Sequence, residues 1–360
     1  MSISAIQGNY DSTFRNTGFN NNGFTTGTIY PNATPLPSDT VEISGKKKGL
    51  TKKQKFVTGA VVAGALTAAV LLMRGKIGAV NKEIKALAEH IDFAPAKTIE
   101  EAINFAKTNL GIKKYSKDMP LDVMNWINEG LVNVNNATKG KAIMPKKVAY
   151  KDFTGTVRDK TVHGAMAVDG YGTLYCNNTA VLEDELKSNL KTFVDNQDII
   201  EHYFGKDIVQ LSKRYLEHPE TFSFKEKTII SDSIGEISRA LNCMTLDIPV
   251  SGHYKIDGFR KIYHEMGHLQ HQHSAGMTKF MQMRKPSEFK GGKASNITSD
   301  FLNSQEKQQT ANFISDYATE SPCEFVAETY KMLMSQAIHG GEKLPDDVMK
   351  LYAEYKGPAL

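Results

Sequence analysis

Helical periodicity dominates the hydrophobic pattern of the chain. Apolar side chains recur every three or four residues between Ile230 and Met244, which is typical of a helix that packs one face into a core. Residues 186–216 show a further helical pattern, and Thr98-Ile99-Glu100-Glu101 has the N-cap and the acidic first turn of a helix start. Residues 77–140 show short polar helical patterns joined by connectors, so we interpret them as a helical linker.

A strand pattern interrupts the helices between residues 163 and 176. His163–Val168 and Tyr171–Cys176 have the composition of strands, and Asp169-Gly170 between them is a signal for a two-residue turn. We therefore predict a β-hairpin here. Helices on both sides of one hairpin indicate an α+β fold class that is mostly helical.

The first 76 residues differ from the rest in pattern. Residues 1–45 are rich in Asn, Thr, Ser and Gly and nearly lack charge, so we interpret them as a disordered polar tail. Six lysines between Lys46 and Lys55 then precede an uncharged stretch, Phe56–Met73. At about 1.5 Å per residue, this stretch reaches about 27 Å, close to the ~30 Å of a bilayer core. We predict that residues 46–76 form one transmembrane helix, which anchors the chain in a membrane through residues 56–73.

A signal peptide and a buried core helix are the alternatives for this apolar stretch. The charged region begins too late for an ordinary signal peptide, and a core helix is rarely flanked by six lysines. The lysines slightly favour a cytoplasmic N-terminus, with the large domain on the other side. Three scattered cysteines, Cys176, Cys243 and Cys323, favour instead a reduced environment for that domain. The side of the membrane stays open.

Composition and charge narrow the class of partner. The chain has 360 residues, of which 40% are hydrophobic and 23% charged, and its net charge is +4 at pH 7. Residues 1–90 hold eleven Lys/Arg and five Asp/Glu, a charge of +6, so the remainder carries −2. The main domain is therefore not predicted to bind nucleic acid. The cysteines are too few for a disulfide framework or a cysteine-based zinc site.

The candidate chemistry is concentrated in His264-Glu265-Met266-Gly267-His268. Asp257 is a suitable N-cap for a helix through this motif, and the apolar side chains between Phe259 and Leu269 fall on the face opposite the histidines. Residues four apart project from one helix face, so His264 and His268 supply two ligands of a tetrahedral zinc ion. Glu265 beside them is the candidate base that accepts a proton from a metal-bound water.

A second helix carries the candidate third ligand. Ser321 and Pro322 have the types of an N-cap and of a first helical residue, and Gly340 marks the end of the helix. Glu324 and Glu328 lie one turn apart on a stripe of this helix. Glu324 is the candidate metal ligand, and Glu328 is the candidate acceptor for the far N–H of a ligating histidine.

Other interpretations of these residues are weaker. Glu324 in isolation would suit a capping box, and His264 and His268 would suit the surface of an amphipathic helix. His271 and His273 are too close along the first helix to complete the site well, so we expect both to face solvent.

Beyond these residues, the chain resembles a known family. His264–His268, then Tyr317, and then Glu324-Phe325-Val326-Ala327-Glu328 resemble the catalytic domain of the anthrax lethal factor and its bacterial gluzincin relatives. The interval of seven residues from Tyr317 to Glu324 is the family's interval, while Val326 replaces its more common Phe. The resemblance implies that Glu324 is the third zinc ligand and that Tyr317 donates a hydrogen bond to the substrate oxyanion.

The resemblance also implies a fold and an activity. The fold is a zincin-like domain over residues 141–360 with a small mixed sheet. Separately, we hypothesise that the strand of Ala165, Met166, Ala167 and Val168 is the edge along which an extended substrate adds. The activity is zinc-dependent hydrolysis of a peptide or protein substrate. Together with the transmembrane helix predicted above, this describes a single-pass membrane protein, which we expect to be bacterial. The alternatives are a membrane-anchored, non-catalytic zincin-like module and a delivered effector protein.

Overall fold

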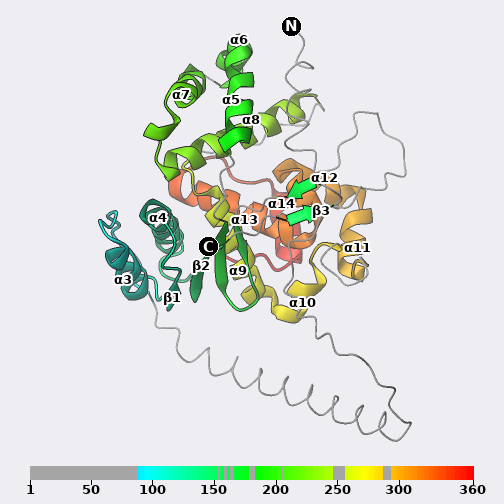
Figure 1. Ribbon diagram of the computed structural model, residues 1–360. Coiled ribbons are helices and arrows are strands. Elements are labelled where there is room, and N and C mark those ends of the chain that lie inside the picture. Colours follow the sequence, from blue (N-terminus) through cyan, green and yellow to red (C-terminus); the bar gives the residue numbers. More distant parts are fainter. Residues whose placement is uncertain are drawn as a thin grey trace, which may run out of the picture. The chain divides into compact units, whose positions relative to one another are not determined.

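The computed structural model of the chain describes residues 87–151, 155–157, 160–162, 166–177, 183–204, 206–245, 256–286 and 293–360 (Figure 1). The predicted disordered tail and the predicted transmembrane helix lie outside these residues. Within the described ranges, no helix is both long and apolar enough to cross a membrane.

Helices make up most of the described chain (Figure 1). The α-helices are α3 (Ile99–Asn109), α4 (Leu121–Ala137), α5 (Glu183–Asp195), α6 (Gln197–Phe204), α7 (Lys206–Glu217), α8 (Phe224–Thr245), α9 (Arg260–Ala275), α10 (Met277–Gln282), α11 (Asn296–Asn303), α12 (Gln305–Ile314), α13 (Pro322–His339) and α14 (Asp346–Glu354). Two 3-10 helices, η2 (Pro219–Thr221) and η4 (Tyr317–Glu320), connect them. The mostly helical α+β class is confirmed.

The strands form a small mixed sheet and a separate pair. The strands are β1 (Lys114–Tyr115), β2 (Lys147–Lys151), β3 (Gly155–Val157), β4 (Lys160–Val162), β5 (Met166–Val168) and β6 (Thr173–Asn177). The sheet has the order β1-β2-β6-β5: β1 and β6 run parallel to β2, and β5 runs antiparallel to β6. Strands β3 and β4 pair antiparallel with each other. Strand β5 is therefore at one edge of the sheet, where it contacts α9.

The predicted hairpin is present, but its turn is longer than predicted. Val168 pairs with Leu174, and a four-residue loop, Asp169–Gly172, joins β5 to β6. The Asp169 carboxylate accepts hydrogen bonds from the N–H of Tyr171 at 2.9 Å and of Thr173 at 2.8 Å. Gly172 has a φ of +79°, so the left-handed residue is Gly172 rather than Gly170. Residues 163–165, including Ala165 of the predicted edge strand, lie outside the described residues.

The predicted helical linker is instead part of the main core. Helix α4 is 17 residues long, and its Trp126 is buried, with the indole N–H donating to the carbonyl of Gly258 at 2.8 Å. Asn128 is also buried and donates to the carbonyl of Ala102 on α3 at 3.0 Å. Strand β1 of this segment pairs with β2 beyond it. The predicted boundary at residue 140 therefore does not separate two units, and Ala88–Leu360 belongs to one unit.

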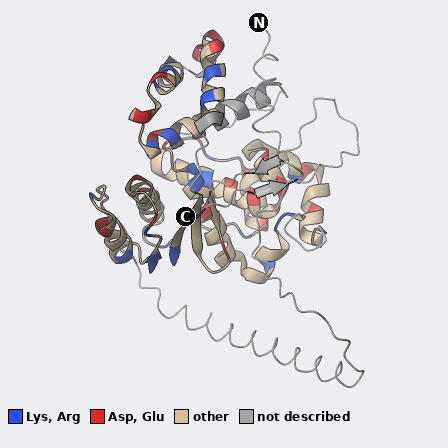
Figure 2. Ribbon diagram, viewed as in Figure 1, with Lys and Arg blue, Asp and Glu red and all other residues tan. Residues whose placement is uncertain are grey.

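Helices α5 to α8 pack around a second apolar cluster. Leu190, Phe193, Val209, Tyr215 and Ile230 are buried there. These helices match the helical patterns predicted over residues 186–216 and 230–244, although side chains beyond residue 234 of α8 lie outside those described. Figure 2 shows basic and acidic positions interspersed along α5 and α7. Helix α6 has acidic positions but no Lys or Arg.

Helix α9 is packed between the sheet, α4 and α13. Its predicted core face is confirmed, because Phe259, Ile262, Tyr263, Met266 and Leu269 are all buried in one cluster with Tyr330 and Met334 of α13. Gly267 lies where α9 meets α13. A Cβ at this position would be 2.9 Å from the Cα of Ala327 and 3.1 Å from its carbonyl oxygen. Glycine therefore sets how closely the two helices approach.

Replacing Gly267 with Ala should lower the free energy of unfolding. The added methyl group meets the backbone of α13, and overpacking costs of about 1–3 kcal/mol exceed the gain of up to about 1 kcal/mol in helix propensity. Urea unfolding at constant pH measures the change. Gly170→Ala is the matched control, because its nearest neighbour is the flexible end of Met277 at 3.1 Å. An unchanged stability of Gly267→Ala would contradict the close-packing argument.

Candidate metal centre

Helix α9 begins later than predicted. Asp257 does not cap it: the N-cap position is Phe259, and the first helical residue is Arg260. The Asp257 carboxylate instead accepts from the N–H of Phe259 at 3.0 Å and from the Tyr263 hydroxyl at 2.8 Å. It also lies 2.8 Å from Nε2 of His339 at the end of α13. Asp257 thus links the start of α9 to the end of the helix packed beside it.

Helix α13 begins and ends as predicted. Ser321 is the N-cap, and its hydroxyl accepts from the N–H of Glu324 at 3.3 Å. Pro322 is the first helical residue, and Gly340, with a φ of +74°, is the C-cap. The capping interaction uses the backbone of Glu324, so the carboxylate of Glu324 is left to point toward α9.

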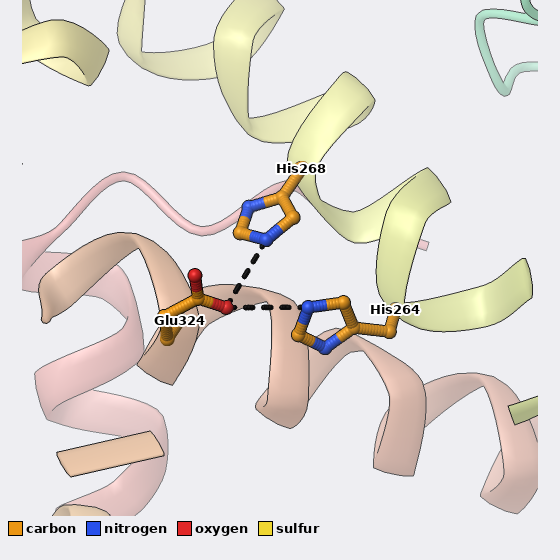
Figure 3. Close-up of side chains that lie close together, drawn as sticks. All are labelled: His264, His268 and Glu324. Atoms are coloured by element: carbon orange, nitrogen blue, oxygen red, sulfur yellow. Dashed lines mark hydrogen bonds and ion pairs between the residues drawn. The ribbon is translucent and has the colours of Figure 1, made fainter. Parts of the chain in front are cut away.

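His264, His268 and Glu324 come together at the crossing of α9 and α13 (Figure 3). Nε2 of His264 and Nε2 of His268 each lie 3.2 Å from the same oxygen, Oε2 of Glu324. The two imidazole rings are edge to face, with centroids 4.7 Å apart and an angle of 89° between their planes. The three candidate ligand atoms lie within 4.8 Å of one another. A group of two imidazole nitrogens and one carboxylate oxygen at these distances can hold a metal ion.

Glu328 holds the far side of His264. Its Oε1 lies 2.8 Å from Nδ1 of His264, and its Oε2 accepts from the Ser315 hydroxyl at 2.7 Å and from the Lys331 ammonium at 2.5 Å. The carboxylate is thus held by Ser315, just before η4, and by Lys331 of α13 itself. Because a carboxylate only accepts hydrogen bonds, Nδ1 of His264 carries the proton. Its Nε2 is then free to bind a cation.

The protonation state of His264 shows whether a cation is compatible with this group. Without one, Nε2 of His264 must also carry a proton to bond Glu324, which makes the ring an imidazolium. Burial opposes that charge, but Glu324 and Glu328 outweigh burial and raise the pKa of His264 to about 10. A divalent cation would take the place of the Nε2 proton and would balance the charge of the same carboxylate. The donor set suits zinc and also other divalent transition metals, so zinc itself stays a prediction.

Glu265 is buried beside the two histidines, with 8% of its surface exposed. Burial raises the pKa of its carboxyl group, and the nearby His264 and His268 offset only part of that rise. A raised pKa makes the carboxylate a stronger base than an exposed glutamate. These properties suit the predicted role in proton transfer.

Tyr317 and Lys285 lie beside the group of His264, His268 and Glu324, and no sequence motif marks Lys285. The Tyr317 ring centroid is 5.6 Å from that of His264. The Lys285 ammonium donates to the Tyr317 hydroxyl oxygen at 2.7 Å and forms ion pairs with Glu320 at 2.6 Å and Glu324 at 3.2 Å. Burial opposes ionisation of Glu324, but Lys285 and the histidines hold its pKa well below the usual range. No spacing signal marks Lys285, because it lies on a connection after α10.

His271 and His273 do not join the group, and the prediction for His271 is wrong. His273 is exposed, as predicted, but His271 is fully buried, and its Nε2 donates to the carbonyl of Tyr355 at 2.8 Å. Its Nδ1 is buried with no hydrogen-bond partner. Burial therefore lowers the pKa of His271 to about 4. The face of α9 that carries His271 is covered by α10 and by the C-terminal residues. Helical periodicity alone does not reveal this cover.

No family model, curated protein or solved structure matches this chain. The interpretation of the site therefore depends on its residues and their geometry.

The buried His271 should make stability depend on pH. The unfolded chain binds its proton near pH 6.5, whereas the folded chain does so only near pH 4. Stability present above pH 6.5 is thus lost as the pH falls toward 4. When the pH falls from 7 to 5, the free energy of unfolding of wild type should decrease by about 2 kcal/mol more than that of His271→Gln. Urea unfolding with a chelator at both pH values measures this loss, with the exposed His90→Gln as control. Equal losses in wild type and His271→Gln would contradict the assignment.

Proposed function

We propose that this chain is a zinc-dependent endopeptidase of the gluzincin type. One observation carries the proposal: the imidazoles of His264 and His268 converge on one oxygen of Glu324, 3.2 Å from each, while Glu328 holds the far nitrogen of His264 at 2.8 Å. A histidine whose second nitrogen bonds a carboxylate is typical of catalytic and structural metal sites. Three protein ligands leave a fourth position for water, as catalytic zinc requires.

The roles of the residues follow from where they lie. A zinc ion held by His264, His268 and Glu324 would supply Lewis acidity and would lower the pKa of a bound water to about 7. Glu265 accepts the proton of the attacking water and passes it to the leaving amine. The Tyr317 hydroxyl donates to the oxyanion that develops on the scissile carbonyl. Glu328 keeps His264 in the tautomer and ring orientation that binding needs.

The arrangement of elements supports a zincin-like fold. Helix α9 carries the histidines and contacts the edge strand β5, and α13 crosses it with the third candidate ligand. An extended peptide that adds to β5 would run along a strand that α9 contacts, and this supports an endopeptidase rather than an enzyme for small substrates. The membrane helix in residues 56–73 stays a prediction, because that stretch lies outside the described residues.

Zinc content and peptide cleavage test the proposed function together. The full chain should bind one zinc and cleave casein or a peptide library. Glu265→Gln should keep the zinc and lose cleavage by a factor of about 10²–10⁴, because only the base is removed. Glu324→Ala should bind zinc more weakly, because a ligand is removed. Elemental analysis and a fluorescence assay measure the two properties.

Glu306→Ala is the control for the loss of a carboxylate, because Glu306 is exposed on α12. A folded wild-type chain that binds no zinc would rule out the proposal. Zinc at one per chain with no cleavage of any library peptide would favour the non-catalytic alternative instead.

Val168 offers a test of the substrate edge. Asp169 donates its N–H to the carbonyl of Thr173 at 3.1 Å, and hydrogen-bonded pairs alternate along an antiparallel ladder. Ala167 therefore bonds β6, whereas the N–H of Val168 faces the open edge. Val168→Pro removes that donor without removing a bond to β6. It should raise KM several-fold with kcat little changed, whereas Val168→Ala should not. Equal KM values in steady-state assays would contradict binding along β5.

A further inference from the structure

Lys285 contacts three groups of the site at once, and none of the predicted roles includes it. We propose that Lys285 is a positioning residue of the metal centre: its ammonium holds the Tyr317 hydroxyl and the outer oxygen of Glu324 in place relative to the two histidines. The inference rests on the proposed function, since it assigns to Lys285 the orientation of two groups that the reaction uses.

The backbone of the two residues that precede Lys285 is held by hydrogen bonds to neighbouring helices. The carbonyl of Met283, two residues earlier, accepts from the N–H of Cys323 on α13 at 3.2 Å. The carbonyl of Arg284 accepts from the Thr298 hydroxyl on α11 at 3.1 Å. Met283 itself is fully buried. Two helices thus fix the connection from which Lys285 extends, so the position of its ammonium does not depend on a free loop.

The ammonium has as many acceptors as it has N–H groups. It lies 2.7 Å from the hydroxyl oxygen of Tyr317, 2.6 Å from Oε2 of Glu320 and 3.2 Å from Oε1 of Glu324. Its side chain is only 15% exposed. A lysine buried to this extent is stable when its N–H groups are satisfied and its charge is balanced, and these acceptors, two of them carboxylates, do both. It also lies 4.1 Å from the centroid of the Tyr317 ring.

These contacts have a direct consequence for Tyr317. An ammonium donates and cannot accept, so the tyrosine oxygen is the acceptor in this bond. The proton of Tyr317 must then point away from Lys285, and it is available to a group in the site. Burial and the Glu324 charge raise the pKa of Tyr317 well above its usual value, which keeps this proton in place. Lys285 therefore selects the orientation in which Tyr317 is a donor.

The two oxygens of Glu324 have different partners. Oε1 faces Lys285 at 3.2 Å, whereas Oε2 faces both imidazoles. A carboxylate held on one oxygen presents the other in a defined direction, as bonds to groups around a metal site generally do. A single lysine thus orients two residues, Tyr317 and Glu324, from one fixed point.

The alternative is that Lys285 only neutralises buried carboxylates. That role requires a positive charge but no specific link to Tyr317. The two roles differ in one measurable property: positioning predicts that the effects of Lys285→Met and Tyr317→Phe are not additive, because the first acts through the second. Neutralisation alone predicts independent effects.

The first arm uses the metal-free full chain and needs no activity. We expect Lys285→Met and Tyr317→Phe each to lower Tm in the presence of a chelator, and the double variant to lose less than the sum of the two. Lys350→Met, at an exposed position on α14, controls for the loss of a lysine. Additive Tm losses would overturn the proposal. If Lys285→Met does not fold, Lys285→Met with Glu320→Gln, which removes one charge of each sign, replaces it in both arms.

The second arm uses the zinc-loaded chain. Lys285→Met should keep one zinc and lower kcat by about 10²–10³, as loss of an oxyanion donor does, with KM within about threefold. The double variant should be slowed by less than the product of the two single effects, because part of the effect of Lys285 acts through Tyr317, and Lys285→Arg should recover part of kcat. A further fall of the same factor in the Tyr317→Phe background would overturn the proposal. If wild type binds zinc but cleaves nothing, the proposed function fails, and the metal-free arm still decides the link between Lys285 and Tyr317.

Discussion

The close crossing of α9 and α13 at Gly267 is the constraint on which the candidate site depends. Each helix carries one part of the candidate metal-binding group: His264 and His268 lie on α9, and Glu324 lies on α13. A side chain at position 267 would meet the backbone of Ala327 at 2.9 Å, so only glycine permits this separation. The convergence of three side chains on one point is thus a consequence of backbone packing, and the buried apolar face of α9 supplies the free energy that maintains it.

Burial of charge is the second constraint on the site. Glu320, Glu324 and Glu328 lie within one segment of chain, and ionised carboxylates that are removed from water need partners. Lys285 pairs with the first two, and Lys331 pairs with the third at 2.5 Å. Three carboxylates against two lysines leave a net negative charge before the histidines are counted. That balance suits a site for a divalent cation.

Local signals predicted local structure well. Ser321, Pro322 and Gly340 bound α13 because capping and the left-handed residue after a helix depend on neighbouring residues alone. Helix α3 likewise begins at the Thr98 N-cap. Two local signals failed, the Asp257 N-cap of α9 and the two-residue turn of the hairpin. The other failures concern segments that depend on distant partners. The polar character of residues 77–140 predicted a linker, yet α4 is buried, because asparagines such as Asn128 are satisfied by hydrogen bonds inside the core.

By itself, the sequence determined the mostly helical α+β class, the two helices of the site and the face that the apolar residues of α9 bury. It also placed His264 and His268 on one side of a helix, because the period of 3.6 residues is a property of the chain. Only the tertiary structure decided that Glu324 reaches those histidines, that His271 is enclosed and that Lys285 enters the site. These depend on contacts between residues far apart along the chain, such as the bond of Lys285 to Tyr317 across 32 positions. Periodicity describes one helix at a time, and it does not encode which helix lies against which.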